Sequence, residues 1–287
     1  MYAFLLNHFG NNKTYFKYEL YFLLSFRDKT KYDIIYFYSI NDTPKEYIDI
    51  IDSLNLNIIF IPFNDDKITF NIDFNSSYES FNLLRTCNYI FGFELLKYKK
   101  ICTIETDMII PESIDDIFEL KCPSIVFYKL NNKNINKNIK INLNKIEKED
   151  LLKVCEKESF TNGGVILFEP SIEYFKLLKK NIKIIIKNNC RFPSETLFLY
   201  TFPYFYNLPI KYNTSHFFVS IDKYKSKELI KVLHFNNTEY KPIFIIEDKD
   251  FDITKMKNPI KKKLLLEYKE KYYNKYNKKI NKLINKL

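Results

Sequence analysis

Short runs of apolar residues recur along the first two thirds of the chain, each bounded by polar or turn-forming residues. They are rich in Ile, Phe, Tyr and Val, and nearly continuous rather than alternating, which is typical of strands in a sheet covered on both faces. The predicted strands are Tyr2–Leu6, Asp33–Tyr38, Asn57–Ile61, Lys100–Ile104, Ser124–Tyr128 and Gly164–Phe168.

Helix-like stretches lie between the first of these strands. Tyr15–Arg27 carries an apolar face, and Tyr78–Tyr98 is the longest stretch. Pro44–Leu54 follows Asp42 and Thr43, which suit helix caps, and its Pro suits a first helical position. This alternation of strand and helix predicts βαβ units and a largely parallel sheet, with ligands bound at the carboxyl ends of the strands.

The rest of the chain divides differently. Residues 131–150 are polar and low in complexity, which predicts a surface loop or insertion. From Ile260 onward the pattern predicts one basic helix, and we expect a domain over 1–250 and a helical tail over 251–287. The apolar side of that helix would hold Leu264, Tyr268, Tyr272, Tyr276, Ile280, Leu283, Ile284 and Leu287.

The positive charge is concentrated in the tail. The chain has a net charge of +10, and residues 255–287 alone contain twelve lysines against two glutamates, so the remainder is neutral. A neutral body argues against a nucleic-acid-binding protein. The tail has several interpretations: a solvated helix packed on the body, a peripheral contact with an anionic membrane surface, a homodimer contact, or salt-sensitive nucleic-acid binding by the tail alone.

Cysteine usage bears on the compartment. The count is odd and there is no CxxC pair, which favours free thiols in a reducing compartment over disulfides or a zinc site. The N-terminal segment MYAFLLNHFG lacks a basic region, and there is no apolar run of about 18 residues, so we expect a cytoplasmic protein without a signal peptide or membrane span. The cysteines are Cys87, Cys102, Cys122, Cys155 and Cys190.

Two acidic residues follow a predicted buried strand directly. Glu105 and Asp107 are two positions apart in extended chain, so their carboxylates point to the same side at the strand's carboxyl end. Carboxylate oxygens suit a divalent cation, which can neutralise a diphosphate. By spacing alone, a strand-end cap with solvent-facing acids is the more common explanation. The same spacing recurs in a polar turn at Asp248, Asp250 and Asp252.

The segment around the two acids resembles one family in particular. LLKYKKICTIETDMIIPESIDDIFEL is similar to the helix, strand, DxD motif and following segment of glycosyltransferase family 8, the glycogenin-like enzymes. That family has Asp at both acidic positions, whereas Glu105 stands first here, and its longer side chain can still reach a metal. The resemblance therefore favours the metal interpretation of the pair.

Further segments match the family in the same order along residues 2–245. FTNGGVILFEPS resembles FNxGVxxxxPS, LPIKYN resembles LPxxYN, and VLHFNNTEYKPI resembles HFxGxxKPW. Near the N-terminus, Asn12 and Tyr15 precede LLSFR at the spacing of the family's uracil and ribose contacts. The chain departs from the family at Asn237, which replaces Gly, at Ile243, which replaces Trp, and at Ser194 and Glu195, which replace a DQ pair.

The resemblance implies a role for each matched residue. Glu105, Asp107 and His234 would hold Mn²⁺, with Mg²⁺ as the alternative ion. Glu195 and Asn162 would act catalytically at the donor sugar. The residues implied in binding the nucleotide sugar are Asn12, Tyr15, Arg85, Thr106, Asn162, Gly163, Gly164, Asn237 and Lys241.

The resemblance also implies a fold and a reaction. The fold would be GT-A, an α/β architecture with a Rossmann-like nucleotide-binding mixed sheet and helices on both faces. The reaction would be retaining transfer of a hexose, glucose or galactose, from a UDP-sugar to a hydroxyl of a glycan or protein acceptor. Two alternatives stand beside it: a catalytically weak module that binds a nucleotide sugar or a partner, and self-glucosylation on tyrosine. His8 and His216 match no family segment, and we expect them to be structural.

Overall fold

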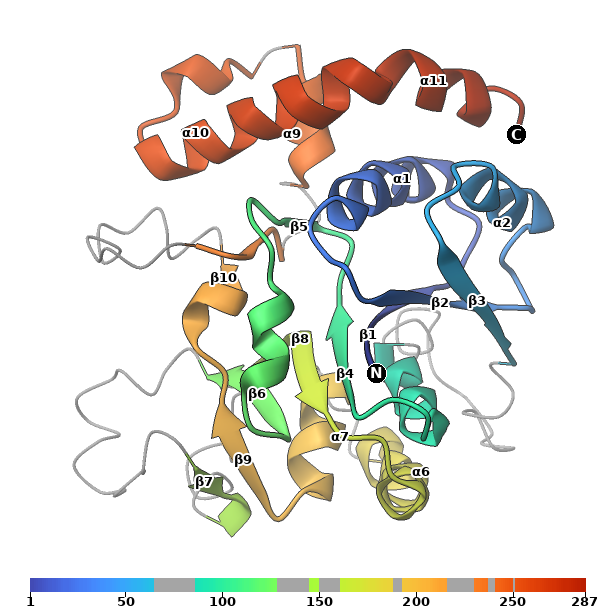
Figure 1. The fold of residues 1–287 in the computed structure, drawn as a ribbon, viewed down its shortest axis with the longest axis vertical. Helices are drawn as coiled ribbons and strands as arrows, with labels where there is room; N and C mark the ends of the chain where they lie inside the picture. Colours follow the sequence, from blue (N-terminus) through green and yellow to red (C-terminus); the bar gives the residue numbers. More distant parts are fainter. Residues whose placement is uncertain are drawn as a thin grey trace.

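The computed structural model describes residues 1–64, 86–127, 145–149, 161–187, 193–215, 230–236, 241–249 and 251–287. Its centre is an eight-stranded sheet in the order β3-β2-β1-β4-β8-β6-β9-β7 (Figure 1). The strands are β1 Tyr2–His8, β2 Asp33–Ser39, β3 Ile58–Phe63, β4 Lys100–Ile104, β6 Ser124–Phe127, β7 Ile146–Glu147, β8 Thr161–Phe168 and β9 Tyr204–Asn207.

All six predicted strands are present, with ends that differ by a few residues. The N-terminal part of the sheet, β3-β2-β1-β4, is parallel, as the βαβ pattern predicts. From β8 onward the sheet is mixed, because β8 runs antiparallel to both β4 and β6 while β9 runs parallel to β6. The sheet as a whole is therefore mixed, with its parallel half at the N-terminus.

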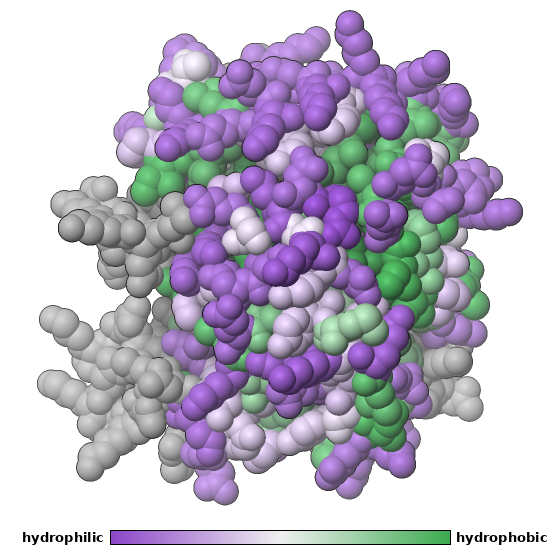
Figure 2. Space-filling view, in the orientation of Figure 1, coloured by the Kyte–Doolittle hydropathy of each residue, from purple (hydrophilic) through white to green (hydrophobic). Residues whose placement is uncertain are grey.

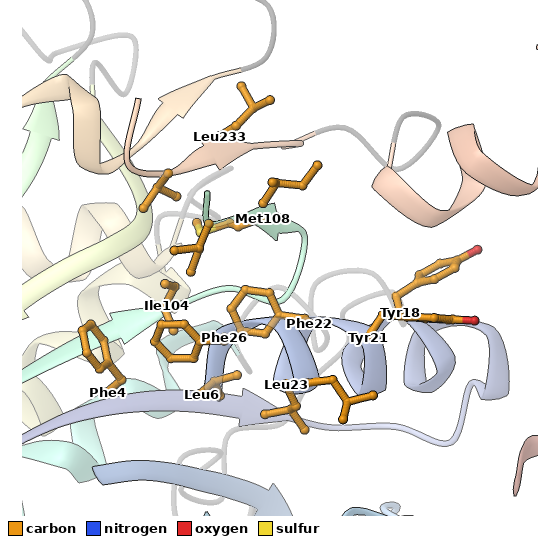
Figure 3. Packing of buried hydrophobic residues seen from close by; sticks show 14 of the residues in the cluster. Phe4, Leu6, Tyr18, Tyr21, Phe22, Leu23, Phe26, Ile104, Met108 and Leu233 are labelled. Carbon is orange, nitrogen blue, oxygen red and sulfur yellow. The ribbon is translucent and has the colours of Figure 1, made fainter. Parts of the chain in front are cut away.

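Helices cover both faces of the sheet, which explains why its strands are apolar on both sides. On one face lie α1 Lys13–Arg27 and α2 Lys45–Asp52; on the other lie α6 Ile172–Lys187, α7 Pro193–Thr201 and the 3₁₀ helix η1 Thr86–Glu94 (Figure 1). Successive residues of β1 alternate between the two cores. Phe4 and Leu6 pack toward α1, as Figure 3 shows, whereas Ala3 and Leu5 pack on the opposite side.

Two helix predictions need correction. Helix α2 begins at Lys45, with Pro44 as its N-cap and no side-chain cap, because Asp42 instead accepts a hydrogen bond from the Gly10 N–H (3.0 Å). The described part of the predicted helix Tyr78–Tyr98 is the 3₁₀ helix η1, which ends at Glu94; residues 78–85 lie outside the described residues. The absence of a side chain at Gly92 lets η1 lie close to β8, since a Cβ there would be 2.9 Å from Phe168 Cζ.

The predicted loop 131–150 also needs a partial correction. Only residues 145–149 fall within the described residues, and there Ile146–Glu147 forms strand β7 against β9. The side chain of Ile146 is buried in the core beneath α6 and α7. This end of the segment is therefore an edge of the sheet, although its flanking polar residues hid the strand in the sequence.

A second, three-stranded sheet brings distant parts of the chain to the end of β4. It consists of β10 Thr214–Ser215, β11 Leu233–His234 and β5 Met108–Ile109, in the order β10-β11-β5. Strand β11 runs antiparallel to β5, and the Phe235 N–H donates to the Asp107 carbonyl at 2.9 Å. The backbone pairing thus carries His234 to the acidic segment. Two short 3₁₀ helices flank these strands, η2 Asp115–Glu119 and η3 Ile210–Tyr212.

The C-terminal tail is helical and lies across α1 (Figure 1). A π-helical turn, η6 Lys269–Tyr273, joins α10 Pro259–Tyr268 to α11 Asn274–Ile284, so the predicted basic helix is confirmed. The short helices α9 Pro242–Glu247 and η5 Ile253–Lys255 precede it.

The apolar side of the tail belongs to the same core as α1. Leu265 and Ile280 are fully buried there, and the Tyr21 hydroxyl of α1 donates to Asn277 at 3.1 Å. Polar side chains project from the outer side, at the top of the view in Figure 2. The structure therefore supports the interpretation of a helix packed on the body, because the face that a membrane or dimer contact would use is covered within the chain.

Two expectations from composition concern the described residues only. None of the helices described combines the length and apolarity that crossing a bilayer requires. Cys87, Cys102 and Cys122 are free thiols, as predicted, whereas Cys155 and Cys190 lie outside the described ranges.

Candidate metal and nucleotide site

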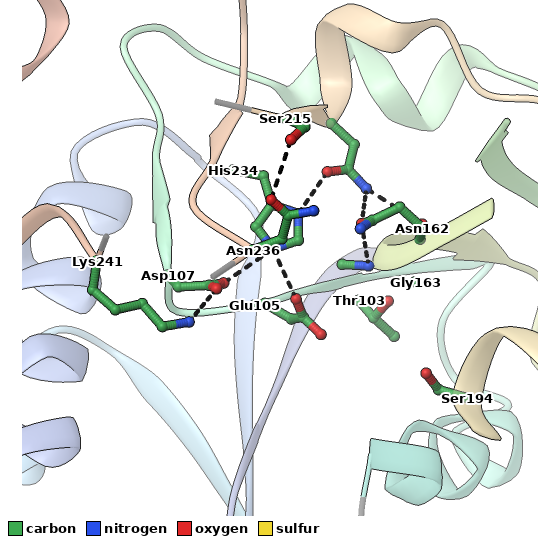
Figure 4. A network of polar contacts seen from close by, with 12 residues as sticks. Thr103, Glu105, Asp107, Asn162, Gly163, Ser194, Ser215, His234, Asn236 and Lys241 are labelled. Atoms are coloured by element: carbon green, nitrogen blue, oxygen red, sulfur yellow. Dashed lines mark hydrogen bonds and ion pairs between the residues drawn. The ribbon is translucent and has the colours of Figure 1, made fainter. Parts of the chain in front are cut away.

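Three side chains from two separate parts of the chain converge beyond the end of β4. Glu105 and Asp107 lie in the turn between β4 and β5, and His234 lies on β11 (Figure 4). His234 Nε2 is 3.0 Å from Glu105 Oε2 and 3.3 Å from Asp107 Oδ1. One ligand atom from each residue falls within 4.8 Å of the others. The three groups therefore face one common point, as a set of metal ligands would.

Burial and donor chemistry both fit a divalent cation at that point. Asp107 Oδ1 is buried and accepts no hydrogen bond within the described part of the chain. Two carboxylates and an imidazole suit Mn²⁺ well, and carboxylate oxygens also suit Mg²⁺. The Glu105 side chain is half exposed, so the site opens toward solvent on its side.

The orientation of the His234 ring is fixed by a buried amide. The other ring nitrogen, Nδ1, lies 2.9 Å from Asn213 Oδ1. An amide oxygen can only accept, so Nδ1 carries the proton in this contact and Nε2 faces the carboxylates. The Asn213 amide group also donates to Asn162 Oδ1 at 2.7 Å, which links His234 to the glycine-containing end of β8.

The start of β8 lies unusually close to His234. The pairing of β6 with β8 shifts between Ile125 and Val126, so that residues 163–165 have no partner in β6. A Cβ on Gly164 would lie 2.4 Å from His234 Cε1 and 2.8 Å from the Met108 Cε methyl. Only glycine fits there, which gives Gly164 a packing role that the sequence match did not distinguish from sugar contact. Gly163 and Gly164 both lie within β8.

The electrostatics of the site are dominated by charge pairing in a buried place. Burial lowers the pKa of His234, but Asp107 and Glu105 outweigh it and raise that pKa to about 9. For Asp107, burial raises the pKa, whereas His234 and Lys241 lower it more strongly, so the carboxyl pKa is well below its usual range. Lys241 Nζ donates directly to Asp107 Oδ2. The positive charge of Lys241 thus lies beside the two acidic side chains.

A cavity of about 260 Å³ opens next to these groups. It lies at the carboxyl ends of β1 and β4, where parallel strands usually place ligands. Its lining combines acidic, basic, hydroxyl and aromatic groups, the mixture that a charged sugar nucleotide requires. The lining residues are Asn7, Phe9, Thr86, Tyr89, Thr103, Ile104, Glu105, Thr106, Asp107, Gly163, Ser194 and Lys241.

Several predicted donor-binding residues lie at this cavity, and others do not. Thr106, Gly163 and Lys241 line it. Asn12 is the N-cap of α1, where its Oδ1 accepts from the Thr14 and Tyr15 N–H groups. Tyr15 is 45% exposed and lines a smaller neighbouring hollow that shares Thr106 and Lys241 with the cavity. Arg85 and Asn237 lie outside the described residues.

Glu195, predicted to be catalytic, lies behind the cavity wall. Its Oε1 accepts from the Gly163 N–H at 3.1 Å, and its Oε2 accepts from the Ser194 hydroxyl at 2.6 Å. Burial raises the pKa of Glu195, while these two hydrogen bonds act in the opposite direction. Glu195 thus connects α7 to β8 through its hydrogen bond to Gly163. The groups that face the cavity are Gly163 and Ser194.

Sequence reasoning missed three residues at the site. Asn213 lies in the LPIKYN segment that matched the family, so that match could have identified it. Asn7 and Phe9 line the cavity from the end of β1, and Asn7 Oδ1 is buried with no hydrogen-bond partner among the residues described. Their position at the carboxyl end of the first parallel strand was the available signal.

Asn213 provides a test of how His234 is held. Replacing Asn213 by leucine, which is similar in size but cannot accept from the ring, should weaken Mn²⁺ binding by about 10- to 100-fold. Asn213→Asp keeps an acceptor for Nδ1 and is the matched control, with Mn²⁺ affinity retained. Both are measured by electron paramagnetic resonance of free Mn²⁺. Equal affinities for the leucine variant and the unmodified protein would contradict the proposed orienting role.

Comparisons with known proteins support the fold. No family model matches the sequence, and no curated protein matches it. Among solved structures, the galactosyltransferase LgtC in complex with donor and acceptor sugar analogs superposes with a TM-score of 0.58 at 12% identity, covering 92% of this chain and 95% of that chain. An active-site mutant of LgtC gives a TM-score of 0.60 at 12% identity with the same coverage.

GlyE from Streptococcus pneumoniae TIGR4, a glycosyltransferase, superposes with a TM-score of 0.56 at 13% identity, covering 96% of this chain and 63% of that chain. At such identities the likeness defines the fold. The chain has the GT-A fold, a mixed sheet with helices on both faces, as the sequence predicted.

Proposed function

We propose that this protein is a metal-dependent glycosyltransferase that moves a hexose, glucose or galactose, from a UDP-sugar to a hydroxyl group of a glycan or protein acceptor. The observation that carries the proposal is the convergence of Glu105, Asp107 and His234 beside Lys241 at the cavity. The GT-A fold shared with LgtC and GlyE supports it.

The site has the charges that departure of a nucleoside diphosphate requires. A bound Mn²⁺ ion would supply a Lewis acid for the diphosphate oxygens. Lys241 lies close enough to the acids to pair with the same diphosphate, and it would stabilise the negative charge that develops on the leaving group. Gly163 leaves backbone exposed at the cavity wall, where the hexose ring would lie.

The family resemblance adds finer points to this proposal. Mn²⁺ is the expected ion, and transfer with retention of the anomeric configuration is the expected outcome, with Asn162 at the donor sugar. We treat residues 1–250 as the transferase domain and 251–287 as a helical extension that covers α1. The proposed donor, ion and stereochemistry can each be measured directly.

The decisive experiment measures UDP release from a panel of UDP-sugars with Mn²⁺, with Mg²⁺ and with EDTA. The proposal expects release from UDP-glucose or UDP-galactose that depends on the metal. Intact-mass measurement of the protein in the same reactions shows whether one of its own tyrosines is the acceptor. Metal-independent release, or none from any donor, would contradict the proposed transferase.

A second function is favoured by the environment of Glu195. Both its carboxylate oxygens are engaged within the protein, and Ser194 stands where the family has an acid, so fewer charged groups reach the sugar. A module that binds a nucleotide sugar without transferring it would have such a site. Binding of UDP with Mn²⁺ by calorimetry, without UDP release from any donor, would favour this second function.

A further inference from the structure

A buried charged cluster behind the cavity has no role in the chemistry described above. His8, at the end of β1, is 7% exposed, and its Nδ1 lies 2.6 Å from Glu19 Oε2 on α1. The same carboxylate oxygen accepts from the Tyr36 hydroxyl of β2 at 2.8 Å. Burying an acid and a histidine in an apolar core costs free energy unless the two are paired. We therefore looked for what this pair contributes.

Both nitrogens of the His8 ring face acceptors. Nδ1 faces the Glu19 carboxylate, and Nε2 faces the Gly10 carbonyl at 3.1 Å. A neutral imidazole has one N–H and can serve only one of them, whereas the imidazolium serves both. The geometry therefore describes an ion pair in which the charged ring also holds the backbone of Gly10.

The loop that His8 holds forms one wall of the cavity. Residues 9–12 connect β1 to α1, and Phe9 lines the cavity. Gly10 has φ +90, a left-handed conformation that glycine adopts without strain. Its N–H donates to Asp42 at 3.0 Å, and the Tyr47 hydroxyl donates to the Asn11 carbonyl at 2.7 Å. The loop is thus held by side chains from β1, from α2 and from the turn before α2.

We propose that the His8–Glu19 ion pair is a positioning device for this loop: it holds the wall that carries Phe9 in the shape that binds the nucleotide, so that nucleotide affinity depends on the charge of His8. This inference rests on the proposed function, because it takes the cavity to be a nucleotide site. Neither His8 nor Glu19 lines the cavity. His8 acts through the backbone of Gly10, and Glu19 acts through His8.

The pH dependence has a definite sign. Burial lowers the pKa of His8, but Glu19, the Gly10 carbonyl and Asp42 together raise it above its ordinary value of 6.5. The groups that face the ring are Glu19 on α1, Tyr36 on β2, Tyr47 on α2 and Asp42 before α2. The positive charge is therefore present below the ordinary pKa and is lost as the pH rises through the raised pKa, so nucleotide affinity should fall over that range.

The test measures UDP binding by calorimetry with saturating Mn²⁺, the condition under which the proposed function expects the nucleotide to bind. His8→Gln removes the charge; it should weaken UDP binding about tenfold at low pH, as expected for the loss of a charge-assisted hydrogen bond. The ratio of the two affinities should shrink toward one as the pH rises and the unmodified protein loses its charge. UDP and the other groups of the protein titrate in the same way in both measurements, so their effect on affinity cancels in this ratio.

Two controls separate positioning from general damage. Tyr36→Phe keeps the ion pair and should keep the pH dependence. Mn²⁺ binding without nucleotide, at the separate set of acids and His234, should be the same in His8→Gln as in the unmodified protein. If His8→Gln does not fold, the same ratio is measured with Glu19→Gln, which removes the negative partner of the His8 ring.

The outcomes distinguish this inference from the proposed function. If the unmodified protein does not bind UDP, the proposed function fails and the inference fails with it. If it binds UDP, and His8→Gln binds equally well at every pH, only the inference is overturned. A ratio of the two affinities that stays constant or grows as the pH rises through the range where His8 loses its charge would also overturn it.

Discussion

Replacing Asp107 by alanine should remove metal binding and, with it, transfer activity. Asp107 is the most buried acid of the site, and it contacts His234 and Lys241 at once. Changes to groups that only orient a ligand cost about 10- to 100-fold in metal affinity, so loss of a ligand should cost more than about 100-fold. Mn²⁺ binding by electron paramagnetic resonance and metal-dependent UDP release measure the two effects.

The control for this change is an acid of the same type elsewhere. Asp252 caps η5 on the surface, where its carboxylate accepts from the Thr254 N–H, and Asp252→Asn should leave Mn²⁺ affinity unchanged. Asp107→Asn keeps the size of the side chain but removes its charge. It therefore shows whether Mn²⁺ binding depends on the charge of Asp107 or on its shape. Mn²⁺ binding in Asp107→Ala at the original affinity would remove the basis of the metal site.

Replacing Leu265 by alanine should destabilise the whole protein. Leu265 on α10 is fully buried in the core that also contains α1. Truncation of a buried leucine costs about 2–5 kcal/mol through lost burial and the cavity left behind. For a chain of this size that corresponds to a fall in Tm of roughly 3–8 °C, which differential scanning calorimetry measures.

The matched control lies on the same helix. Ile260 is 37% exposed, and Ile260→Ala should change the free energy of unfolding by no more than about 0.5 kcal/mol. If Leu265→Ala left Tm unchanged, the tail would not be part of the core. Its apolar face would then be available for the membrane or dimer contacts that the sequence also allowed.

The central sheet could be predicted because its strands are buried on both faces. The run around Ile34 and Ile35 is continuously apolar because these two side chains enter the cores on opposite faces of the sheet. A helix that packs on one side needs apolar residues on that side only. The strands that could not be predicted are short. Those of the small sheet, such as Leu233–His234, span two residues, too few to produce a period, and they form because the backbone pairs with a partner far along the chain.

The site could be predicted only in part, and for physical reasons. The spacing of Glu105 and Asp107 places both acids on one side, but no spacing can show that His234 meets them, and that expectation came from the family resemblance. Asn12 matched a base contact, yet its side chain caps α1, since a local hydrogen bond to the following N–H groups competes with ligand contact. The cluster around His8 is assembled from separate elements, and no local pattern records it.

The two-residue pairing of β11 with β5 has a consequence for how the protein acquires its site during synthesis. His234 joins the acids only when chain made more than a hundred residues after them has folded back, as the 134-residue separation of Asp107 and Lys241 illustrates. A nascent chain that stops short of β11 would present two carboxylates alone, and would hold a cation loosely. Tight binding of the proposed cation would therefore require the chain to be folded as far as β11.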